Sequence, residues 1–307
     1  MQYLSEAVTS ELVDEQLALD AARAAFTSEG MVFPVVVGRT PVEGQRFTLK
    51  SGSTGSATGV KIGTYWLGNS ELGIPRHGST TILLDPATGR LAAVIEAASA
   101  NAMRTAAADA LAVQTLARPD AATLAVVGTG TQAYYEAIAV ARVRPITTVL
   151  VAGRDPEKAD ALAARIGARL NTIHTQAAPI DAAVASADVI VTATTSREPL
   201  FEAGWVRPGT HVSAMGADGP GKRELPSALY EHAALFCDVA EQTRTLGEFQ
   251  HAPEHVTITP LGAVISGSAP GRQTADQITI FDSSGFALQD LTLAEHILAA
   301  YEATRSR

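Results

Sequence analysis

The middle of the chain, from about residue 121, alternates apolar, β-branched runs with helical patterns. We predict strands at 123–127, 147–152, 171–174, 188–192, 211–215 and 235–239, and helices at 132–143, 155–166, 224–232 and 241–250. Such alternation is typical of a parallel sheet whose crossover connections are helices. It therefore predicts a doubly wound α/β domain, which binds ligands at the carboxyl ends of its strands.

A glycine-rich turn follows the first of these strands. Residues 128–133 read Gly-Thr-Gly-Thr-Gln-Ala and open a helix, which is the GxGxxA form of the dinucleotide fingerprint in its required context. The first glycine permits a tight turn, the second lets the backbone approach a pyrophosphate, and the helix N-terminus attracts its negative charge. We predict a nucleotide site here; the alternative is a glycine-rich turn in an unliganded α/β domain.

The end of the second strand bears on the choice of nucleotide. NAD sites usually carry an acid there, whereas this chain has Gly153 and Arg154. Arg154 can form two parallel hydrogen bonds to a 2′-phosphate, which favours NADP. NAD is the alternative because of Asp155. We expect Asp155 to cap the next helix, but a small backbone shift would turn its carboxylate to the ribose of NAD.

The composition and residue pattern of the chain differ on either side of this block. Residues 32–94 are rich in Gly, Thr, Ser and Val with several turn signals, which predicts an antiparallel or mixed sheet. A helix at 97–117, capped at Asn101, should bridge two domains. We expect a strand at 276–281 and a helix at 285–305 to return to the first domain. The predicted domains are 1–118 plus 275–307, of mixed α+β type, and an inserted Rossmann-type domain at 119–274.

Composition excludes several classes of protein. The chain has 307 residues and a formal charge of -9, with 23 basic against 32 acidic residues, so nothing draws it toward nucleic acid. Cys237 is the single cysteine, which rules out an intrachain disulfide and favours the cytoplasm. No apolar run approaches the ~20 residues of a spanning helix, so we expect no membrane partner. The scattered histidines predict no metal site.

Lys61 lies in an alternating strand pattern, GVKIGTYW, on the same face as Gly59 and Gly63. Small neighbours leave room for a ligand beside the ammonium group. The alternative is a solvated lysine on a strand face.

Arg104 falls in the first turn of its helix if Asn101 is the cap, where a positive charge adds to the positive end of the helix. This unfavourable placement suggests a receptor for a carboxylate. Pairing with Glu96 or Asp109 is the alternative.

Asp218 follows a predicted strand of the nucleotide domain and lies in a glycine-rich loop, SAMGADGPGKREL. A carboxylate beside a cofactor can act as a general acid or base, and a simple Asp turn is the alternative. His77, in IPRHGSTT, either lines a substrate pocket or lies at the surface.

These motifs together resemble the ornithine cyclodeaminase and mu-crystallin family of NAD(P)-dependent proteins along nearly the full length. The resemblance is carried by GVKIGTYWLGN, HGSTTILLDPATG, MRTAAADALA, VVGTGTQA, VSAMGADGPGKREL, LGAVISG, PGR and ITIFDSSGFALQD. It implies a homodimer built through the first domain and an active site between the two domains. It also implies that Lys61 and Arg104 hold a substrate carboxylate and that Asp218 handles the amine or imine.

The chain departs from the family at one position. An arginine that usually follows the early proline is replaced by valine after Pro34, so Arg39 or Arg46 is a candidate replacement. The expected substrate-binding residues are Lys61, Arg104, Arg46 and His77, with Asp218 and Lys61 catalytic. The expected cofactor-binding residues are Gly128, Thr129, Gly130, Thr131, Gln132, Gly153, Arg154, Thr105, Thr194, Met215 and Ser284.

The resemblance predicts an NAD(P)H-dependent reductase that converts a small 2-imino carboxylate to the amino acid, or catalyses the reverse oxidation. A cyclodeaminase that releases ammonia from ornithine or lysine is the first alternative. A non-catalytic protein of the mu-crystallin type, which binds NADP and a small ligand, is the second.

Overall fold

The computed structural model describes residues 1–305 and divides the chain into two compact units. Unit 1 comprises Met1–Arg104 together with the chain from Phe286, and unit 2 comprises Thr105–Gly285. Helix α3, Ala98–Leu116, contains the boundary between the units. The two units are described separately.

Unit 1 is built on a seven-stranded sheet of order β1-β7-β6-β5-β4-β2, with β3 also paired to β4. Its strands are β1 (Gln2–Leu4), β2 (Gly30–Val32), β3 (Val36–Arg39), β4 (Gln45–Thr54), β5 (Thr58–Trp66), β6 (His77–Leu84) and β7 (Leu91–Glu96). Only β1 and β7 pair in parallel. The mixed sheet predicted for residues 32–94 is therefore confirmed.

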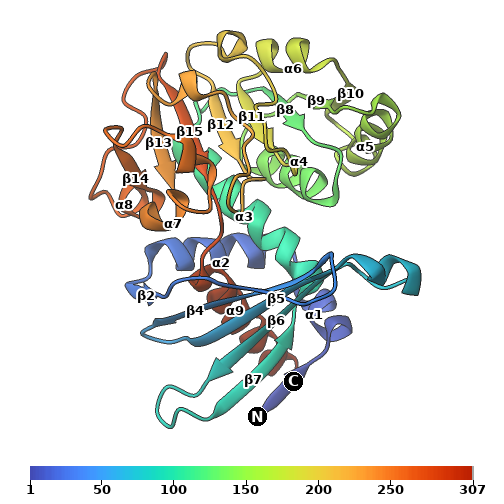
Figure 1. Cartoon of the computed structure of the whole chain (residues 1–307), viewed down its shortest axis with the longest axis vertical. Helices are drawn as coiled ribbons and strands as arrows, with labels where there is room; N and C mark the ends of the chain where they lie inside the picture. The colour runs from blue at the N-terminus through green and yellow to red at the C-terminus, as the bar shows by residue number, and fades with distance from the viewer. Residues whose placement is uncertain (306–307) are drawn as a thin grey trace. The chain divides into compact units, whose positions relative to one another are not determined.

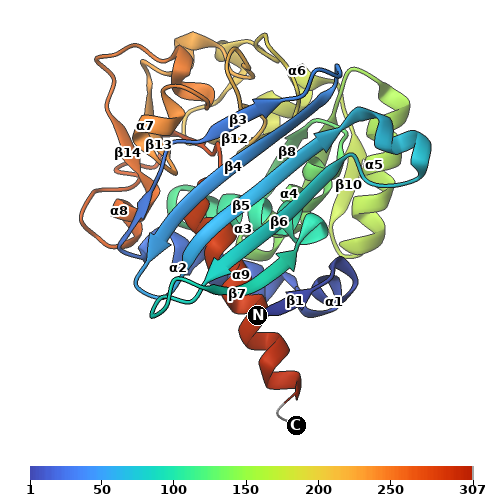
Figure 2. The ribbon, with the colours of Figure 1, turned by 60° about the horizontal axis from the view of Figure 1, so that its bottom comes forward.

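Three α-helices accompany this sheet: α1 (Glu6–Leu12), α2 (Glu15–Thr27) and α9 (Ala287–Arg305), with a 3-10 segment η1 at Leu67–Leu72. Helix α9 packs on β4, β5 and β6 and against α2, as Figure 2 shows. Two glycines permit this close packing, because a Cβ at Gly52 or Gly59 would lie 3.0 Å from Leu288 or 3.1 Å from Leu291. The buried first half of α9 thus forms the core of unit 1 with one face of the sheet.

Unit 2 contains an eight-stranded, fully parallel sheet of order β10-β9-β8-β11-β12-β15-β13-β14 (Figure 1). Its strands are β8 (Thr123–Val127), β9 (Thr148–Ala152), β10 (His174–Ala177), β11 (Val189–Thr192), β12 (His211–Ala214), β13 (Ala233–Cys237), β14 (Ile258–Pro260) and β15 (Ile278–Asp282). Its helices are α4 (Thr131–Val143), α5 (Pro156–Arg169), α6 (Ile180–Ser186), α7 (Ala240–Thr243) and α8 (Leu261–Ile265), with 3-10 turns η2 (Ala203–Trp205), η3 (Ser227–Leu229) and η4 (Glu248–His251).

The strand order reverses direction between β8 and β11, because β9 and β10 extend the sheet on one side of β8 and β11 and β12 extend it on the other. Right-handed crossovers therefore place α4 and α5 on one face and α6 on the opposite face. This confirms the predicted Rossmann-type doubly wound sheet. The reversal marks the ligand-binding crevice at the carboxyl ends of β8 and β11.

The structure corrects the predicted domain boundaries of 1–118 plus 275–307 and 119–274. The strand expected at 276–281 is β15, which pairs with β12 and β13 in the sheet of unit 2 rather than returning to the first domain. A strand buried on both faces fits a central position in a parallel sheet, and β15 supplies the hydrogen bonds that join β12 to β13. Only the terminal helix α9 returns to unit 1.

Two predicted helices and one predicted strand were also misplaced. Residues 224–232 contain only the turn η3, and residues 241–250 contain short α7 and the start of η4. The backbone N–H groups of Glu224 and Leu225 donate to the buried Glu248 carboxylate, so side-chain contacts replace helical hydrogen bonds there. The strand expected at 171–174 is β10, at His174–Ala177.

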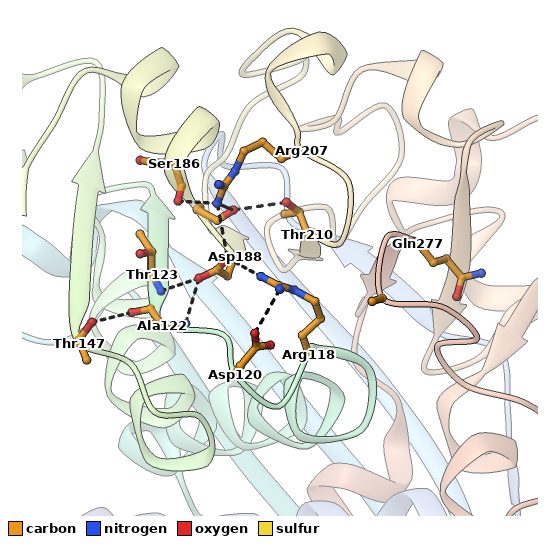
Figure 3. Close-up of polar contacts among 12 residues, drawn as sticks. Arg118, Asp120, Ala122, Thr123, Thr147, Ser186, Asp188, Arg207, Thr210 and Gln277 are labelled. Atoms are coloured by element: carbon orange, nitrogen blue, oxygen red, sulfur yellow. Dashed lines mark hydrogen bonds and ion pairs between the residues drawn. The ribbon is translucent and has the colours of Figure 1, made fainter.

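Asp188 organises the amino edge of this sheet, opposite the predicted ligand edge. Its carboxylate accepts from the backbone N–H groups of Ala122 and Thr123, both at 3.0 Å. It also pairs with Arg118 at 2.7 Å and with Arg207 at 3.4 Å, as Figure 3 shows. The network joins the starts of β8 and β11 to the loop before β12. Asp188 is thus a structural residue of unit 2.

None of the helices within residues 1–305 combines the length and the hydropathy needed to cross a membrane.

Candidate active site

The surroundings of Arg104 differ from the sequence prediction. Helix α3 begins at Ala98, and the Glu6 carboxylate caps it by accepting from the N–H groups of Ala98 at 2.6 Å and Ser99 at 2.8 Å. Asn101 is therefore not the cap, and Arg104 lies in the second turn. The capping acid comes from more than ninety residues away in the sequence, so local spacing gave no sign of it.

Lys61 and Arg104 instead converge on Asp290 of α9. The Lys61 ammonium lies 3.4 Å from Asp290 Oδ1, and Arg104 Nε lies 3.0 Å from the same oxygen. Asn101 Oδ1 accepts from Lys61 Nζ at 2.9 Å and from Arg104 Nη2 at 3.0 Å. Gln289 Oε1 accepts from Arg104 Nη1 at 3.0 Å. The partner of Arg104 is thus neither Glu96 nor Asp109.

The charges of this cluster are buried. Lys61 is 6% exposed, Arg104 7% and Asp290 4%. Burial lowers the pKa of Lys61 to about 8, against the attraction of Asp290 and with the help of nearby Arg104 and Lys50. Burial opposes ionisation of Asp290, but Arg104 and Lys61 together hold its pKa below the usual value. Two cations share one carboxylate, so the cluster carries a net positive charge suited to an anionic ligand.

Arg46 and His77 lie on the same face of the sheet as Lys61. Arg46 pairs with Tyr65 across β4 and β5, and Tyr65 pairs with His77 across β5 and β6. Side chains directly opposite in antiparallel strands share a face, and residues 61 and 65 of one strand do so as well. The Arg46 guanidinium lies 5.4 Å from the centre of the Tyr65 ring, whose centre is 4.8 Å from that of His77.

The predicted fingerprint lies at the carboxyl end of β8. Gly128 adopts φ 134°, and a Cβ there would lie 2.5 Å from the carbonyl oxygen of Ala193, so only glycine fits. Gly130 is the N-cap residue of α4, and no atom lies within 4 Å of the Cβ position there. The turn therefore leaves open space beside the N-terminus of α4, as a bound pyrophosphate requires.

The end of β9 lies beside the fingerprint, because a Cβ at Gly153 would come within 2.6 Å of Thr129. Arg154 follows at an exposed position. Asp155 caps α5: its side chain accepts from the Lys158 N–H at 3.3 Å and pairs with Lys158 Nζ at 2.9 Å. These contacts engage the Asp155 carboxylate as the cap of α5.

Comparisons with known proteins show the family to which the chain belongs. The sequence matches the ornithine cyclodeaminase/mu-crystallin family over residues 5–305. The chain belongs to this family. It is 35% identical to iminosuccinate reductase of Paracoccus denitrificans over 97% of this chain and 96% of that protein. The structure of that reductase in complex with NAD+ has a TM-score of 0.93, at 34% identity, and covers 99% of this chain and 97% of its own.

Two further solved structures are similar to this family member. An archaeal alanine dehydrogenase dimer with bound NAD has a TM-score of 0.92 and 31% identity over 99% of this chain and 97% of that one. Thermococcus litoralis Δ1-pyrroline-2-carboxylate reductase, in complex with NADH and L-proline, has a TM-score of 0.91 and 26% identity over 99% of this chain and 98% of that one.

In this family member Asp218 lies in the loop after β12 and is exposed. It forms an ion pair with Lys222, whose ammonium also donates to the Gly216 carbonyl at 3.0 Å. Sequence reasoning missed Lys222, although it lies four residues from Asp218 in the same loop. The lysine ties the Asp218 carboxylate to the loop backbone and so restricts its direction.

A buried acid, Glu224, fixes the base of this loop. It accepts from the N–H and hydroxyl of Thr194, both at 2.7 Å, from Thr192 Oγ1 at 2.7 Å and from the Gly216 N–H at 2.8 Å. Burial raises the pKa of Glu224 to about 7, although the hydrogen bonds from Thr194 and Thr192 oppose this. Thr194 is thus held at the end of β11 by a residue that sequence reasoning did not select.

The remaining predicted cofactor residues also belong to unit 2. Met215 is buried directly after β12, and Ser284 lies beyond β15, where its hydroxyl accepts from Gln242 Nε2 at 2.7 Å. Both therefore lie at the carboxyl edge of the sheet, with Gly128 and Thr194. Thr105 lies within α3, at the start of unit 2. Among residues 1–305 no group of three metal-ligating side chains is suited to hold an ion.

Proposed function

We propose that this protein is an NAD(P)H-dependent reductase of small 2-imino carboxylates, which it converts to amino acids or forms from them in reverse. The observation that carries the proposal is the buried Lys61–Arg104 pair, which offers two cations in a chain that also contains a dinucleotide fingerprint. Two relatives are named for this chemistry: iminosuccinate reductase and Δ1-pyrroline-2-carboxylate reductase. Both match nearly the whole chain.

Lys61 and Arg104 hold the substrate carboxylate in this proposal. Arg104 is fixed by Asp290, Asn101 and Gln289, so little side-chain entropy remains to be lost when an anion binds. The same contacts fix the direction of the Lys61 ammonium. Orienting the carboxylate also orients the adjacent C2 carbon, the centre that must react.

The reduction adds one hydride and one proton across the C=N bond. The Gly128–Gln132 turn would hold the pyrophosphate of a nicotinamide nucleotide, and the reduced form of that nucleotide would supply the hydride and become oxidised. The proton joins the imine nitrogen first and gives the iminium. The new C–H bond then forms at C2, and the π electron pair moves to nitrogen as the lone pair of the neutral amine. Asp218 pairs with the iminium nitrogen, favours its charged and more electrophilic form, and donates or accepts the proton.

We propose NADP as the preferred nucleotide, with NAD as the alternative. Arg154 offers a fork of donors to a 2′-phosphate, and Asp155 is engaged as a helix cap. The similar solved structures that name a nucleotide contain NAD+ or NADH, so the test must compare both. We expect a higher kcat/KM with NADPH, and a strong preference for NADH would refute the role of Arg154.

A substrate panel tests the reaction. Cyclic and open-chain 2-imino acids, the latter formed from 2-oxo acids and ammonia, are mixed with NADPH or NADH, and nicotinamide absorbance is followed. We expect oxidation of the nucleotide with at least one imine, and at least a 100-fold loss of kcat in Asp218→Asn. Asp160→Asn, which makes the same change at an exposed acid within α5, is the matched control. An unchanged turnover in Asp218→Asn would remove this residue from the mechanism.

The same panel separates the alternatives. Ammonia release from ornithine or lysine with no net change in nicotinamide absorbance would select a cyclodeaminase. Binding of NADP without turnover of any imine would select a non-catalytic binding protein. We further propose a homodimer, the state named for the archaeal alanine dehydrogenase, which sedimentation measurements would test.

A further inference from the structure

Two pairs of like charges face each other directly across the strands of unit 1. Lys50 on β4 pairs with Lys61 on β5, and Arg39 on β3 pairs with Arg46 on β4. Like charges directly opposite in a sheet are destabilising. Both pairs lie on the face that carries Lys61, because positions 46 and 50 of β4 point to the same side. A sheet that keeps two such repulsive pairs has two places that favour an anion.

The inner pair, Lys50 with Lys61, lies next to Asp290 and Arg104, whose charges both act on Lys61. The outer pair has no such acid. Throughout residues 1–305 no carboxylate lies within ion-pair distance of Arg46 or Arg39, and the Arg46 guanidinium lies over the Tyr65 ring. The ring supports the guanidinium from one side and leaves its hydrogen-bonding edge for another group.

Gly63 separates the two positive centres. A Cβ at Gly63 would lie 3.5 Å from Lys61 Cε, 3.9 Å from Lys61 Nζ and 2.8 Å from Thr48 Oγ1. The Lys61 side chain therefore bends along β5 toward Tyr65, and its ammonium lies near Gly63. The next position on this face, Tyr65, lies about 7 Å farther along the strand, two residues at about 3.4 Å each.

We propose that Arg46, supported by Tyr65 and His77, binds a second carboxylate at the far end of the substrate, so that the enzyme acts on imino dicarboxylates. This inference rests on the proposed function and specifies its substrate class. Lys61 and Arg104 take the carboxylate next to C2, and Arg46 takes the distal one through a bidentate contact.

The spacing fits a short substrate. The two carboxyl carbons of an extended four-carbon dicarboxylate are three C–C bonds apart, about 4 Å. A hydrogen bond of about 2.8 Å at each end lengthens the span between donors to about 10 Å. The step of about 7 Å between the Gly63 and Tyr65 positions, together with the reach of an arginine side chain, accommodates a chain of four or five carbons.

The test compares two substrates that differ only at the distal end. Oxaloacetate and 2-oxobutyrate both have four carbons, and with ammonia they give imines that end in a carboxylate and in a methyl group. With saturating NADPH or NADH we expect kcat/KM for the oxaloacetate imine to exceed that for the 2-oxobutyrate imine by about 10-fold, since the exposed Arg46 guanidinium can pair with a carboxylate but not with a methyl group. Equal values for the two imines would refute the distal site while leaving the reductase proposal intact.

Arg46→Met supplies the second arm. We expect the ratio of the two kcat/KM values to fall about 10-fold in this variant, whereas Arg90→Met leaves the ratio unchanged. Arg90 is the matched control, because it is exposed in the turn between β6 and β7, at the end of β6 remote from His77, and its loss changes the net charge equally. A ratio that survives Arg46→Met would overturn the assignment.

Direct binding separates failure of this inference from failure of the reductase proposal. Isothermal titration of L-malate and of 2-hydroxybutyrate, which cannot be reduced at C2, needs no turnover. Tighter binding of malate that is lost in Arg46→Met supports the distal site even if no imine is reduced. Equal binding of the two acids, or malate binding unaffected by Arg46→Met, would refute the site whatever the turnover assays give.

Discussion

The charge state of Lys61 depends on Asp290, and this dependence gives the sharpest test of the candidate site. Asp290→Asn keeps the shape of the side chain but removes the negative charge 3.4 Å from the Lys61 ammonium. Burial already lowers the pKa of Lys61 to about 8, and Asp290 is the group that most strongly opposes this fall. We therefore expect the pKa of Lys61 to fall further in Asp290→Asn.

The size of the effect follows from Coulomb's law. At 3.4 Å and an effective dielectric constant of about 20, the attraction between the two charges is about 5 kcal/mol. Relaxation and water entry reduce this value, but even a third of it lowers the pKa by about one unit, because one unit corresponds to 1.36 kcal/mol. The ammonium form of Lys61, which binds a carboxylate, is then present only below about pH 7 rather than about pH 8.

Titration of L-malate into the protein between pH 6 and pH 10 measures this shift, because malate has no ionisable group in that range. We expect affinity in the unaltered protein to fall as pH rises through about 8, and in Asp290→Asn to fall about one unit earlier. Glu295→Gln, which removes a second acid from α9, is the matched control and should keep the midpoint near 8. The same midpoint in Asp290→Asn as in the unaltered protein would refute the coupling.

Three further outcomes follow from unit 2. Gly128→Ala places a Cβ at a positive-φ position, 2.5 Å from a backbone oxygen. We expect the free energy of unfolding in urea to fall by about 2 to 4 kcal/mol and the affinity for the nucleotide to fall as well. An unchanged urea midpoint would contradict this. Asp188→Ala removes the acceptor of two backbone N–H groups, whereas Arg118 keeps Asp120 and Arg207 keeps the Ser186 and Ala187 carbonyls. The free energy of unfolding should therefore fall by about 2 kcal/mol, while the Kd for the nucleotide, measured by fluorescence, stays within about twofold. Burial raises the pKa of Glu224 to about 7, so the folded state binds more protons than the unfolded state between pH 4.5 and 7. The free energy of unfolding should therefore fall as pH rises through this range. In Glu224→Gln, chemical unfolding should show a weaker dependence of this free energy on pH.

The sequence predicted those parts of the fold whose signals are local. The fingerprint at Gly128 combines a turn, a strand and a helix within a few residues, and the structure places all three there. Hydrophobic runs likewise located most strands of the sheet in unit 2. Strand β15 was assigned to the wrong domain because a buried apolar run does not reveal its neighbours, which lie tens of residues away at His211–Ala214 and Ala233–Cys237.

The candidate site shows the same limit at the level of single residues. Lys61 and Arg104 stood out because their charges contradict their apolar or helical surroundings. Asp290 has the same property, since it is buried in the apolar first half of α9, but its sequence context, ALQDL, also suits an ordinary helix. The cap of α3 was misassigned to Asn101 for a related reason: Asn is a good cap by type, and only the fold brings the Glu6 carboxylate to Ala98 and Ser99.

These long-range contacts change how the positive charge of unit 1 is interpreted. A chain with a formal charge of -9 concentrates Lys50, Lys61, Arg46 and Arg39 on one face of a single sheet, with Asp290 as the acid paired to Lys61. Repulsion within both cross-strand pairs lowers stability in the absence of a ligand, so an anion that neutralises both centres should stabilise unit 1 more than one that neutralises a single centre. Malate should therefore raise the melting temperature more than 2-hydroxybutyrate at equal concentration, and Arg46→Met should abolish the difference.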